Sequence, residues 1–256
     1  MGVKFQSVSR CAEAHWKVND IRLRSISCAC WQWGMGTDLA GITANARNLL
    51  ETIPPHVILV AAAKGRSIDE VKAVLRAGVT HIGHNYVQEA EPMIEALGDT
   101  ATWHMIGHLQ RNKAKIAAAT FDLIETVDSV RLAKALNRHC TNCGRTMQVL
   151  VEVNIGRESS KTGVMPENVD KLVEEMSQFE HLRVLGVMTM GPRFGDPELA
   201  RPYFQQAREI FYRLSNMTLP NVTMRYLSMG MSNSYEVALD EGANIVRIGT
   251  RLFGRR

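Results

Sequence analysis

The stretch Val-Ile-Leu-Val-Ala-Ala-Ala-Lys at residues 57–64 contains seven consecutive apolar residues and ends on a lysine. An apolar run of this length is typical of a strand that is buried on both faces, as in a parallel sheet. The next segment, 67–77, has helical periodicity, because its apolar residues recur on one face. Ser67 is expected to cap this helix, and Gly78 is expected to end it. The sequence here predicts a strand followed by a helix.

The same alternation continues to the end of the chain. Predicted strands lie at 57–63, 80–83, 102–106, 122–127, 148–154, 184–189, 223–227 and 245–248. Predicted helices lie at 67–77, 87–97, 111–119, 130–137, 167–179, 197–214 and 234–241. Eight strands that alternate with helices predict an α/β fold, a single (β/α)8 TIM-type barrel. An open doubly wound sheet has the same local pattern and is the alternative, but the number of strands favours the barrel.

The composition excludes several classes of protein. A chain of 256 residues with 45% hydrophobic and 22% charged residues is typical of a globular protein. The formal charge of +4 gives only a mild field, and no window carries a run of lysine and arginine, so we expect no nucleic-acid partner. No apolar stretch has the roughly 18 residues of a membrane span. Five cysteines without an export signal indicate a reduced, cytoplasmic protein.

The first 34 residues differ from the rest of the chain, because they hold three of the five cysteines and show no sustained periodicity. We interpret residues 1–34 as an extension outside the core and residues 35–256 as the barrel domain. The segment is basic, as a transit peptide would be, but Glu13 and Asp20 argue against that interpretation. A further possibility is that Met35 is the true start.

Polar residues follow the predicted strands, where a barrel of this kind forms its active face. These residues are Lys64, His84, Asn85, Gly107, His108, Asp128, Asn154 and Glu158. Lys64 is the most distinctive, because it ends an apolar run and can emerge into a partly dry mouth. Desolvation disfavours its ammonium form, and a neutral amine can form an imine with an aldehyde cofactor. The alternative is a solvated lysine at a strand end.

Two glycine-containing segments, 227–232 and 246–250, follow the seventh and eighth predicted strands. Loops at this place commonly bind phosphate, because glycine lets backbone N–H groups approach an anion. Arg247 lies two residues before Gly249, so the two should face the same side of the strand. A buried arginine could face a pyridine nitrogen and keep it unprotonated. An interior salt bridge is the alternative for Arg247.

The patterns that would indicate a metal are weak. Cys140 and Cys143 have the spacing of a zinc pair, but no second pair follows. His104 and His108 are four residues apart, yet His104 falls in a predicted strand rather than a helix. We expect these histidines to pack near the barrel mouth, and we expect no metal.

Several motifs together resemble the YggS-type pyridoxal-phosphate homeostasis family, which is similar in fold to the N-terminal barrel of alanine racemase. The motifs are residues 81–89, 103–113, 153–154, 158–163, 227–232 and 246–250. The resemblance implies pyridoxal 5′-phosphate (PLP) as the cofactor and Lys64 as the imine lysine. It also implies the roles of the remaining site residues: Ser228, Gly230, Gly249 and Thr250 around the phosphate, Arg247 at the pyridine nitrogen, and Asn85 and Asn154 near the ring. Lys161 is a further candidate for the mouth of the site.

The chain departs from the pattern of this family at two positions near the expected cofactor. The family usually shows serine where this chain has Ala63, and glutamate where it has His84. Loss of a hydroxyl and exchange of a carboxylate for imidazole are expected to alter cofactor affinity or its pH dependence.

Three functions of different class follow from these residues. The first is a PLP-binding carrier that acts in vitamin B6 homeostasis without substrate turnover. We expect such a carrier to be a monomer rather than an obligate oligomer, and PLP-dependent apo-enzymes are its candidate recipients. The second is an amino-acid racemase-like enzyme, and the third is a barrel that binds another phosphorylated ligand. A racemase of this fold needs a second domain to supply the opposing base, whereas six residues follow Thr250. The sequence therefore favours the carrier.

Overall fold

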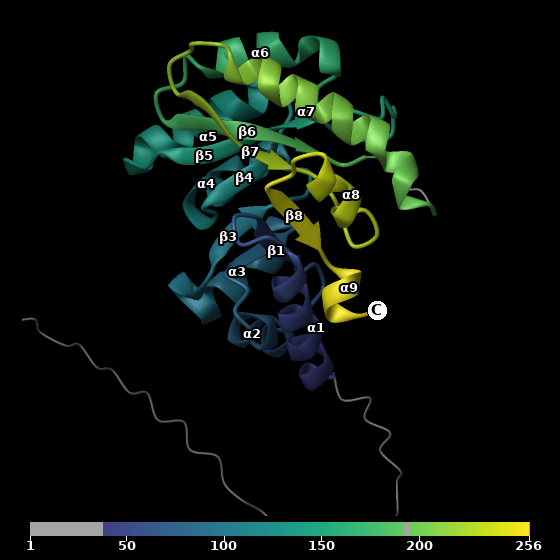
Figure 1. The fold of residues 1–256 in the computed structure, drawn as a ribbon. Coiled ribbons are helices and arrows are strands. Elements are labelled where there is room, and N and C mark those ends of the chain that lie inside the picture. The colour runs from purple at the N-terminus through teal and green to yellow at the C-terminus, as the bar shows by residue number, and fades with distance from the viewer. Residues whose placement is uncertain (1–37, 192–194, 256) are drawn as a thin grey trace, which may run out of the picture. The chain divides into compact units, whose positions relative to one another are not determined.

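A computed structural model of the protein describes residues 38–191 and 195–255, and Figure 1 shows their arrangement. The predicted extension over residues 1–34 lies outside the described residues. None of the helices in these two ranges is long and apolar enough to cross a membrane.

Eight parallel strands form a closed barrel in which each strand pairs with its neighbours in chain order. They are β1 (Ile58–Ala62), β2 (His81–His84), β3 (Thr102–Met105), β4 (Leu123–Val127), β5 (Met147–Val153), β6 (Leu182–Thr189), β7 (Val222–Ser228) and β8 (Ile245–Ile248). Pairing of β1 with β8, from Ile58 opposite Ile245 to Ala61 opposite Ile248, closes the ring. The predicted barrel is confirmed and the open sheet is wrong. Every predicted strand is present, with its bounds shifted by at most two residues.

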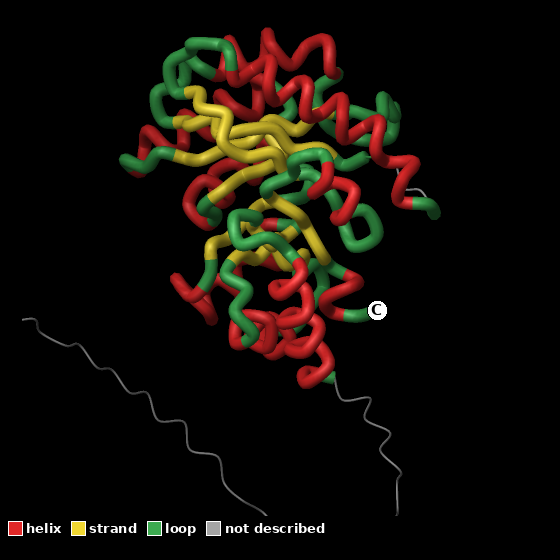
Figure 2. Tube along the Cα trace, viewed as in Figure 1, coloured by secondary structure: helices red, strands yellow, loops and turns green. Residues whose placement is uncertain are grey.

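Helices follow the strands and lie on the outside of the sheet, as Figure 2 shows. The α-helices are α1 (Leu39–Thr52), α2 (Ile68–Arg76), α3 (Val87–Leu97), α4 (Ala114–Thr120), α5 (Val130–Cys143), α6 (Val169–Met176), α7 (Arg201–Ser215), α8 (Tyr235–Asp240) and α9 (Thr250–Phe253). Short 3-10 helices are η1 (Gly98–Thr100), η2 (Arg111–Lys113), η3 (Pro166–Asn168) and η4 (Pro197–Ala200). The sequence did not predict α1 or α9.

Local sequence explains how these helices begin and end. Ser67 caps α2 as predicted: its hydroxyl accepts a hydrogen bond from the Glu70 N–H, and the Glu70 carboxylate accepts one from the Ser67 N–H. Gly78 follows α2 with a φ of 109°, a conformation that favours glycine. In α1, Ile42, Ala46 and Leu49 are buried on one face, which holds that helix against the barrel.

The barrel interior combines an apolar layer with a polar one. Val60, Ile106, Leu123, Leu150, Met188 and Ile245 form an apolar cluster of buried side chains. Beside them, Glu125 and Arg247 are buried within the ring of strands. A buried charge is costly unless it is paired, so the partners of these two side chains bear on the site described next.

Candidate functional site

A cavity of about 870 Å³ opens at the C-terminal ends of the strands. Its lining comes from residues at or after the ends of β1, β2, β3, β6, β7 and β8: Ala62, Lys64, Arg66, Asn85, Ile106, Met190, Met231, Ser232, Asn233, Arg247, Gly249, Thr250, Arg251 and Gly254. This is the face on which (β/α)8 barrels carry their sites. Five predicted site residues meet here: Lys64, Asn85, Arg247, Gly249 and Thr250.

Lys64 stands two residues beyond the end of β1 and is partly buried in the cavity wall. Its Nζ donates a hydrogen bond to the Tyr86 hydroxyl at 3.2 Å and lies 4.8 Å from the centroid of the Tyr86 ring. The Gly65 N–H donates to the Glu89 carboxylate at 3.1 Å, which ties the turn after Lys64 to α3. The primary amine is therefore held at the mouth, where an aldehyde could reach it.

The loops after β7 and β8 bring several hydrogen-bond donors to one side of the cavity. Ser232 Oγ accepts hydrogen bonds from the N–H groups of Gly249 and Arg251, each at 3.3 Å. Thr250, the first residue of α9, and the Arg251 side chain line the same cavity. Backbone N–H groups, hydroxyls and a guanidinium are the donors that bind phosphate in proteins.

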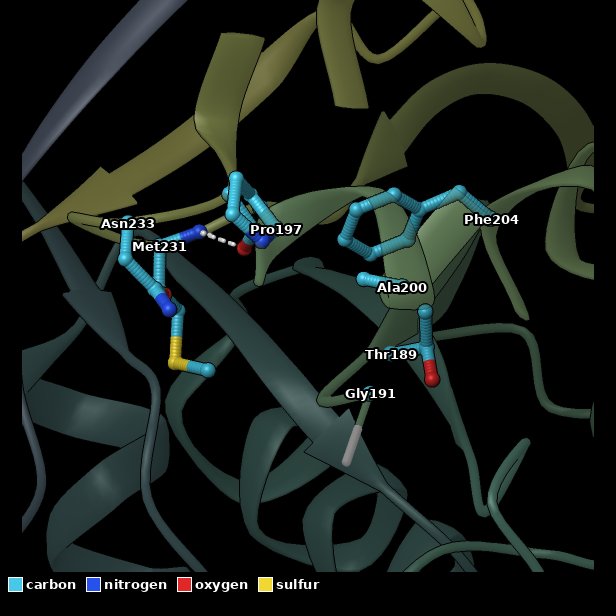
Figure 3. Close-up of a pocket in the computed structure, with 9 residues that line it drawn as sticks. Thr189, Gly191, Pro197, Ala200, Phe204, Met231 and Asn233 are labelled. Carbon is cyan, nitrogen blue, oxygen red and sulfur yellow. Dashed lines mark hydrogen bonds between the residues drawn. The ribbon is translucent and has the colours of Figure 1, made fainter. Parts of the chain in front are cut away.

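Gly230 shapes the loop after β7 rather than the cavity itself. Its φ is 90°, and a Cβ at this position would lie 2.6 Å from the Ala238 Cβ. Gly230 lines a neighbouring hollow of about 10 Å³, in which Figure 3 shows Phe204 and Ala200 on one side and Met231 and Asn233 on the other. That volume is close to the minimum for one water molecule, so the hollow is too small for a cofactor. Gly230 therefore allows the loop that contains Ser232 to pack closely against α8.

Arg247 lines the cavity from β8 and also takes part in a hydrogen-bonded chain inside the barrel. Its Nη1 donates to Ser228 Oγ at 2.5 Å, and its Nη2 donates to the Thr189 carbonyl at 2.8 Å. Ser228 Oγ in turn donates to Glu125 Oε2 at 2.5 Å, and Arg247 Nη1 lies 3.7 Å from the same carboxylate oxygen. The interior salt bridge considered for Arg247 is thus present, while the guanidinium still borders the cavity.

The chain continues from Glu125 to the other end of the barrel. His104 Nδ1 donates to Glu125 Oε1 at 2.7 Å, and His104 Nε2 lies 2.9 Å from His81 Nδ1. Burial raises the pKa of the Glu125 carboxyl, but the hydrogen bond from His104 and the charges of His104 and Arg247 outweigh it, so this pKa lies below its usual range. Burial lowers the pKa of His81 to about 4. We call these five residues, His81, His104, Glu125, Ser228 and Arg247, the interior chain.

Three predicted site residues do not line the cavity. Ser228 is fully buried in the interior chain. Gly230 lines the small hollow, as described above. Asn154 is buried, and its side-chain amide donates to the carbonyls of Glu158 and Lys161 at 2.9 and 3.3 Å. Lys161, the further candidate, binds Glu158 Oε1 at 2.6 Å and is also outside the lining.

Sequence reasoning missed Ser232, Arg251 and Tyr86. Ser232 ends the glycine-containing segment 227–232 and could have been found there, because its hydroxyl follows the tight turn at Gly230. Tyr86 directly follows Asn85, but nothing in the sequence indicates its hydrogen bond to Lys64. Arg251 carries no local signal beyond its place at the start of α9.

The two positions that depart from the family pattern lie behind the cavity wall. Ala63 and His84 are both buried, and neither lines the cavity. The His84 ring is stacked on Trp103 with the ring centroids 6.1 Å apart, and neither ring nitrogen has a hydrogen-bond partner among the described residues. Burial lowers the pKa of His84 to about 4. Any influence of these positions on a ligand is therefore indirect.

The structure separates the two histidines that were expected together near the mouth. His104 lies in the barrel interior, so its predicted place near the mouth is wrong. His108 is half exposed after β3, with its Nδ1 3.8 Å from Asp128 Oδ2. Cys140 is buried and Cys143 is exposed at the end of α5. Within residues 38–191 and 195–255, no three metal-ligating side chains gather as a metal site.

Comparisons with known proteins match the chain to one protein family and to one fold. The family model for the N-terminal domain of alanine racemase matches residues 37–256. A pyridoxal phosphate homeostasis protein of Aquifex aeolicus is 38% identical over 235 residues, which are 91% of this chain and 95% of that relative. A protein of the same name from Schizosaccharomyces pombe is 33% identical over 219 residues, 84% of this chain and 87% of the relative.

Solved structures show the same fold. PipY of Synechococcus elongatus with PLP bound has a TM-score of 0.76 and 32% identity, and the match covers 83% of this chain and all of PipY. Alanine racemase of Clostridium difficile has a TM-score of 0.69 and 16% identity, covering 85% of this chain and 59% of the racemase. The likeness to the racemase is one of fold alone.

Proposed function

Because the chain belongs to the family of pyridoxal phosphate homeostasis proteins, which share the alanine racemase N-terminal domain, we propose that it holds PLP as an imine on Lys64 and acts in vitamin B6 homeostasis without substrate turnover. The observation that carries the proposal is a single cavity that holds a primary amine, a set of anion donors and a buried guanidinium. PLP offers an aldehyde, a phosphate and a pyridine nitrogen to these three groups.

The residues of the cavity fit this cofactor by their chemistry. The Lys64 amine condenses with the aldehyde to form an imine and release one water molecule. Gly249 and Thr250, together with Ser232, supply donors for the phosphate. Arg247 would donate to the pyridine nitrogen and keep it unprotonated, because a guanidinium does not give up its proton. PipY, a relative of the same fold, has been solved with PLP bound.

Of the remaining predicted residues, Asn85 is proposed to contact the cofactor directly, and three are proposed to act through their neighbours. Ser228 orients Arg247 through its hydrogen bond to Nη1. Gly230 allows the tight turn that brings Ser232 to the cavity. Asn154 orders the loop after β5 through the Glu158 and Lys161 carbonyls.

The lining of the cavity supports a carrier rather than a racemase. Among the described residues that line it, Lys64 is the one side chain of a type that commonly acts as a general base. The others carry guanidinium, amide, hydroxyl, thioether or alkyl groups, or are glycine. Racemisation needs a second base on the opposite face of the substrate. An imine with no opposing base can form and hydrolyse. This suits a protein that takes up the cofactor and releases it to PLP-dependent apo-enzymes.

The visible spectrum of the purified protein with added PLP tests the binding proposal. We expect a yellow imine band and a borohydride-stable adduct, both lost in Lys64→Ala. The matched control is Lys161→Ala, which removes a nearby lysine outside the cavity and should keep the band. An adduct that persists in Lys64→Ala, mapped by peptide mass to another lysine, would refute the assignment of Lys64.

A chirality assay tests the absence of turnover. Single-enantiomer alanine is incubated with the PLP-loaded protein, and the enantiomer ratio is followed over time with Lys64→Ala as the control. We expect no racemisation beyond the control. Racemisation at enzyme-like rates that disappears in Lys64→Ala would favour the racemase instead.

A further inference from the structure

A basic groove lies on the outer wall of the barrel, between the η2–α4 segment and α5, which pack against each other. Its volume is about 1110 Å³. Five exposed cationic side chains line it: Arg111, Lys115, Arg131, Lys134 and Arg138. No aspartate or glutamate is among its described lining residues. In Figure 1 the two walls, α4 and α5, are neighbours on the same side of the barrel.

The cations of this groove form no ion pair within the described part of the chain. Thirteen ion pairs connect other residues there, and none of them includes the five cations of the groove. His139 also lines the groove, and its pKa is lowered by partial burial and by the positive charges of Arg138 and Lys115. A surface of this kind attracts an anionic partner.

The spacing of the cations is that of a helix face. Arg131, Lys134 and Arg138 are three and four residues apart on α5, so they rise along its axis by about 4.5 and 6 Å. Ala135 and Phe179, both partly buried, contribute apolar surface between the cationic walls. Carboxylates three and four residues apart on a second helix repeat the same rises. An acidic amphipathic helix would therefore meet both the charges and the apolar floor.

One end of the groove is connected to the surroundings of the cavity through a single turn of the chain. A polar hollow of about 370 Å³ shares Asn85 with that cavity and is also lined by Gln110 and Lys113. Arg111, between those two residues in the chain, lines the groove. One short turn thus borders the hollow next to the cavity and the basic groove. A protein bound at the Arg111 end of the groove would therefore approach the side of the barrel on which the cavity opens.

We propose that the groove binds an acidic amphipathic helix on a protein that receives the cofactor. This inference rests on the proposed function for the identity of the partner. A nucleic acid fits the groove less well, because single strands bind through stacking on several aromatic rings, whereas one ring, that of Phe179, is among the described lining residues.

Fluorescence anisotropy on the full-length, PLP-loaded protein tests the proposal. The probe is a labelled helical peptide with glutamates three and four residues apart beside a leucine ridge, and the comparison peptide has glutamine in place of glutamate. The groove variant carries Arg131→Gln, Lys134→Gln and Arg138→Gln. The control variant carries Arg47→Gln, Lys72→Gln and Lys171→Gln, three exposed cations on α1, α2 and α6, so both variants lose the same formal charge.

We expect the acidic peptide to bind, with an affinity that falls as salt is added. The groove variant should bind it about tenfold more weakly, since it loses three exposed charge pairs that each contribute modestly. The control variant should bind the acidic peptide as tightly as the wild type does. The glutamine peptide should not bind the wild type. These two controls separate an effect of the groove from a general effect of charge.

Three results would overturn the proposal. The first is that the acidic peptide does not bind at low salt. The second is that the groove and control variants bind the peptide equally weakly. The third is that a single-stranded oligonucleotide of equal charge binds more tightly than the peptide and that the groove variant abolishes this binding. The imine band is recorded on every sample. A normal band with no peptide binding refutes the groove alone, whereas loss of the band in the wild type refutes the proposed function.

Discussion

The interior chain makes a strong prediction about Glu125. This carboxylate is fully buried and accepts hydrogen bonds from His104 at 2.7 Å and Ser228 at 2.5 Å, with Arg247 3.7 Å away. Glu125→Gln keeps the shape of the side chain but removes its charge. The amide has a single acceptor oxygen, so one of the bonds from His104 and Ser228 is lost and the other is no longer charge-assisted, at roughly 1 kcal/mol each. Arg247 also loses the nearest negative charge, and breaking a buried pair costs about 3–5 kcal/mol in total.

Urea denaturation followed by circular dichroism measures this loss. At pH 7 we expect the free energy of unfolding to fall by about 3–5 kcal/mol and the melting temperature to fall by about 10 °C. The control is Glu167→Gln at the exposed pair with Arg157, which should leave the denaturation midpoint unchanged. If Glu125→Gln and the wild type unfold at the same urea concentration, then Glu125 does not neutralise Arg247.

The pH dependence of stability provides a second, independent test of the role of Glu125. The pKa of Glu125 in the folded protein lies below its usual value, which is about 4.3 in an unfolded chain. Its stabilising contribution is therefore complete above that value and is lost as the pH falls through the folded pKa. The difference in stability between wild type and Glu125→Gln should shrink in acid. A difference that stays constant down to the acid transition would mean that packing, not charge, explains the loss.

Three further predictions concern the rest of the chain. Ser232→Ala should weaken PLP binding by about tenfold, because a hydroxyl beside the phosphate donors is lost, while the imine band remains at saturating PLP; an unchanged titration curve would remove Ser232 from the site. Because the folded pKa of His84 is about 4, the unfolded chain binds more protons between pH 4 and 6.5 and stability falls as the pH falls through this range. His84→Leu should remove about 3 kcal/mol of this pH dependence, and an identical stability profile would contradict the assignment. Removal of residues 1–34 should leave the imine band and melting temperature unchanged, since the residues from Thr37 onward form one unit, and early melting would place the segment in the core.

The fold could be predicted because buried strands of a barrel are apolar on both faces. Segment 57–64 shows this most clearly, whereas β7 has a weaker signal, because only its last two residues are buried. The missed helices had weaker signals. α9 has four residues, too few for a helical period to appear, and α1 directly follows the atypical N-terminal segment, although Ile42, Ala46 and Leu49 have the right spacing.

The site could be predicted only in part, because strand position gives the end of the barrel but not the partner of each side chain. Lys64, Arg247 and Gly249 follow from strand ends and alternation, and all three line the cavity. Ser228 ends β7 and was assigned to the phosphate, yet its hydroxyl lies between Glu125 and Arg247. These three residues are far apart in the sequence, so no local pattern could show that the serine is used inside the barrel.

This division of the site bears on how a carrier can bind its cofactor and still release it. Glu125, Ser228 and the Thr189 carbonyl connect Arg247 to β4, β7 and β6, so contacts within the protein hold its guanidinium in the inner wall. Lys64, in contrast, stands in the mouth, in contact with the exposed ring of Tyr86. Water that enters the mouth can hydrolyse an imine there without any change in the barrel. Under the proposed function, release would then require only that contacts between the phosphate and the β7 and β8 loops break, and a partner bound beside the mouth could compete for the phosphate.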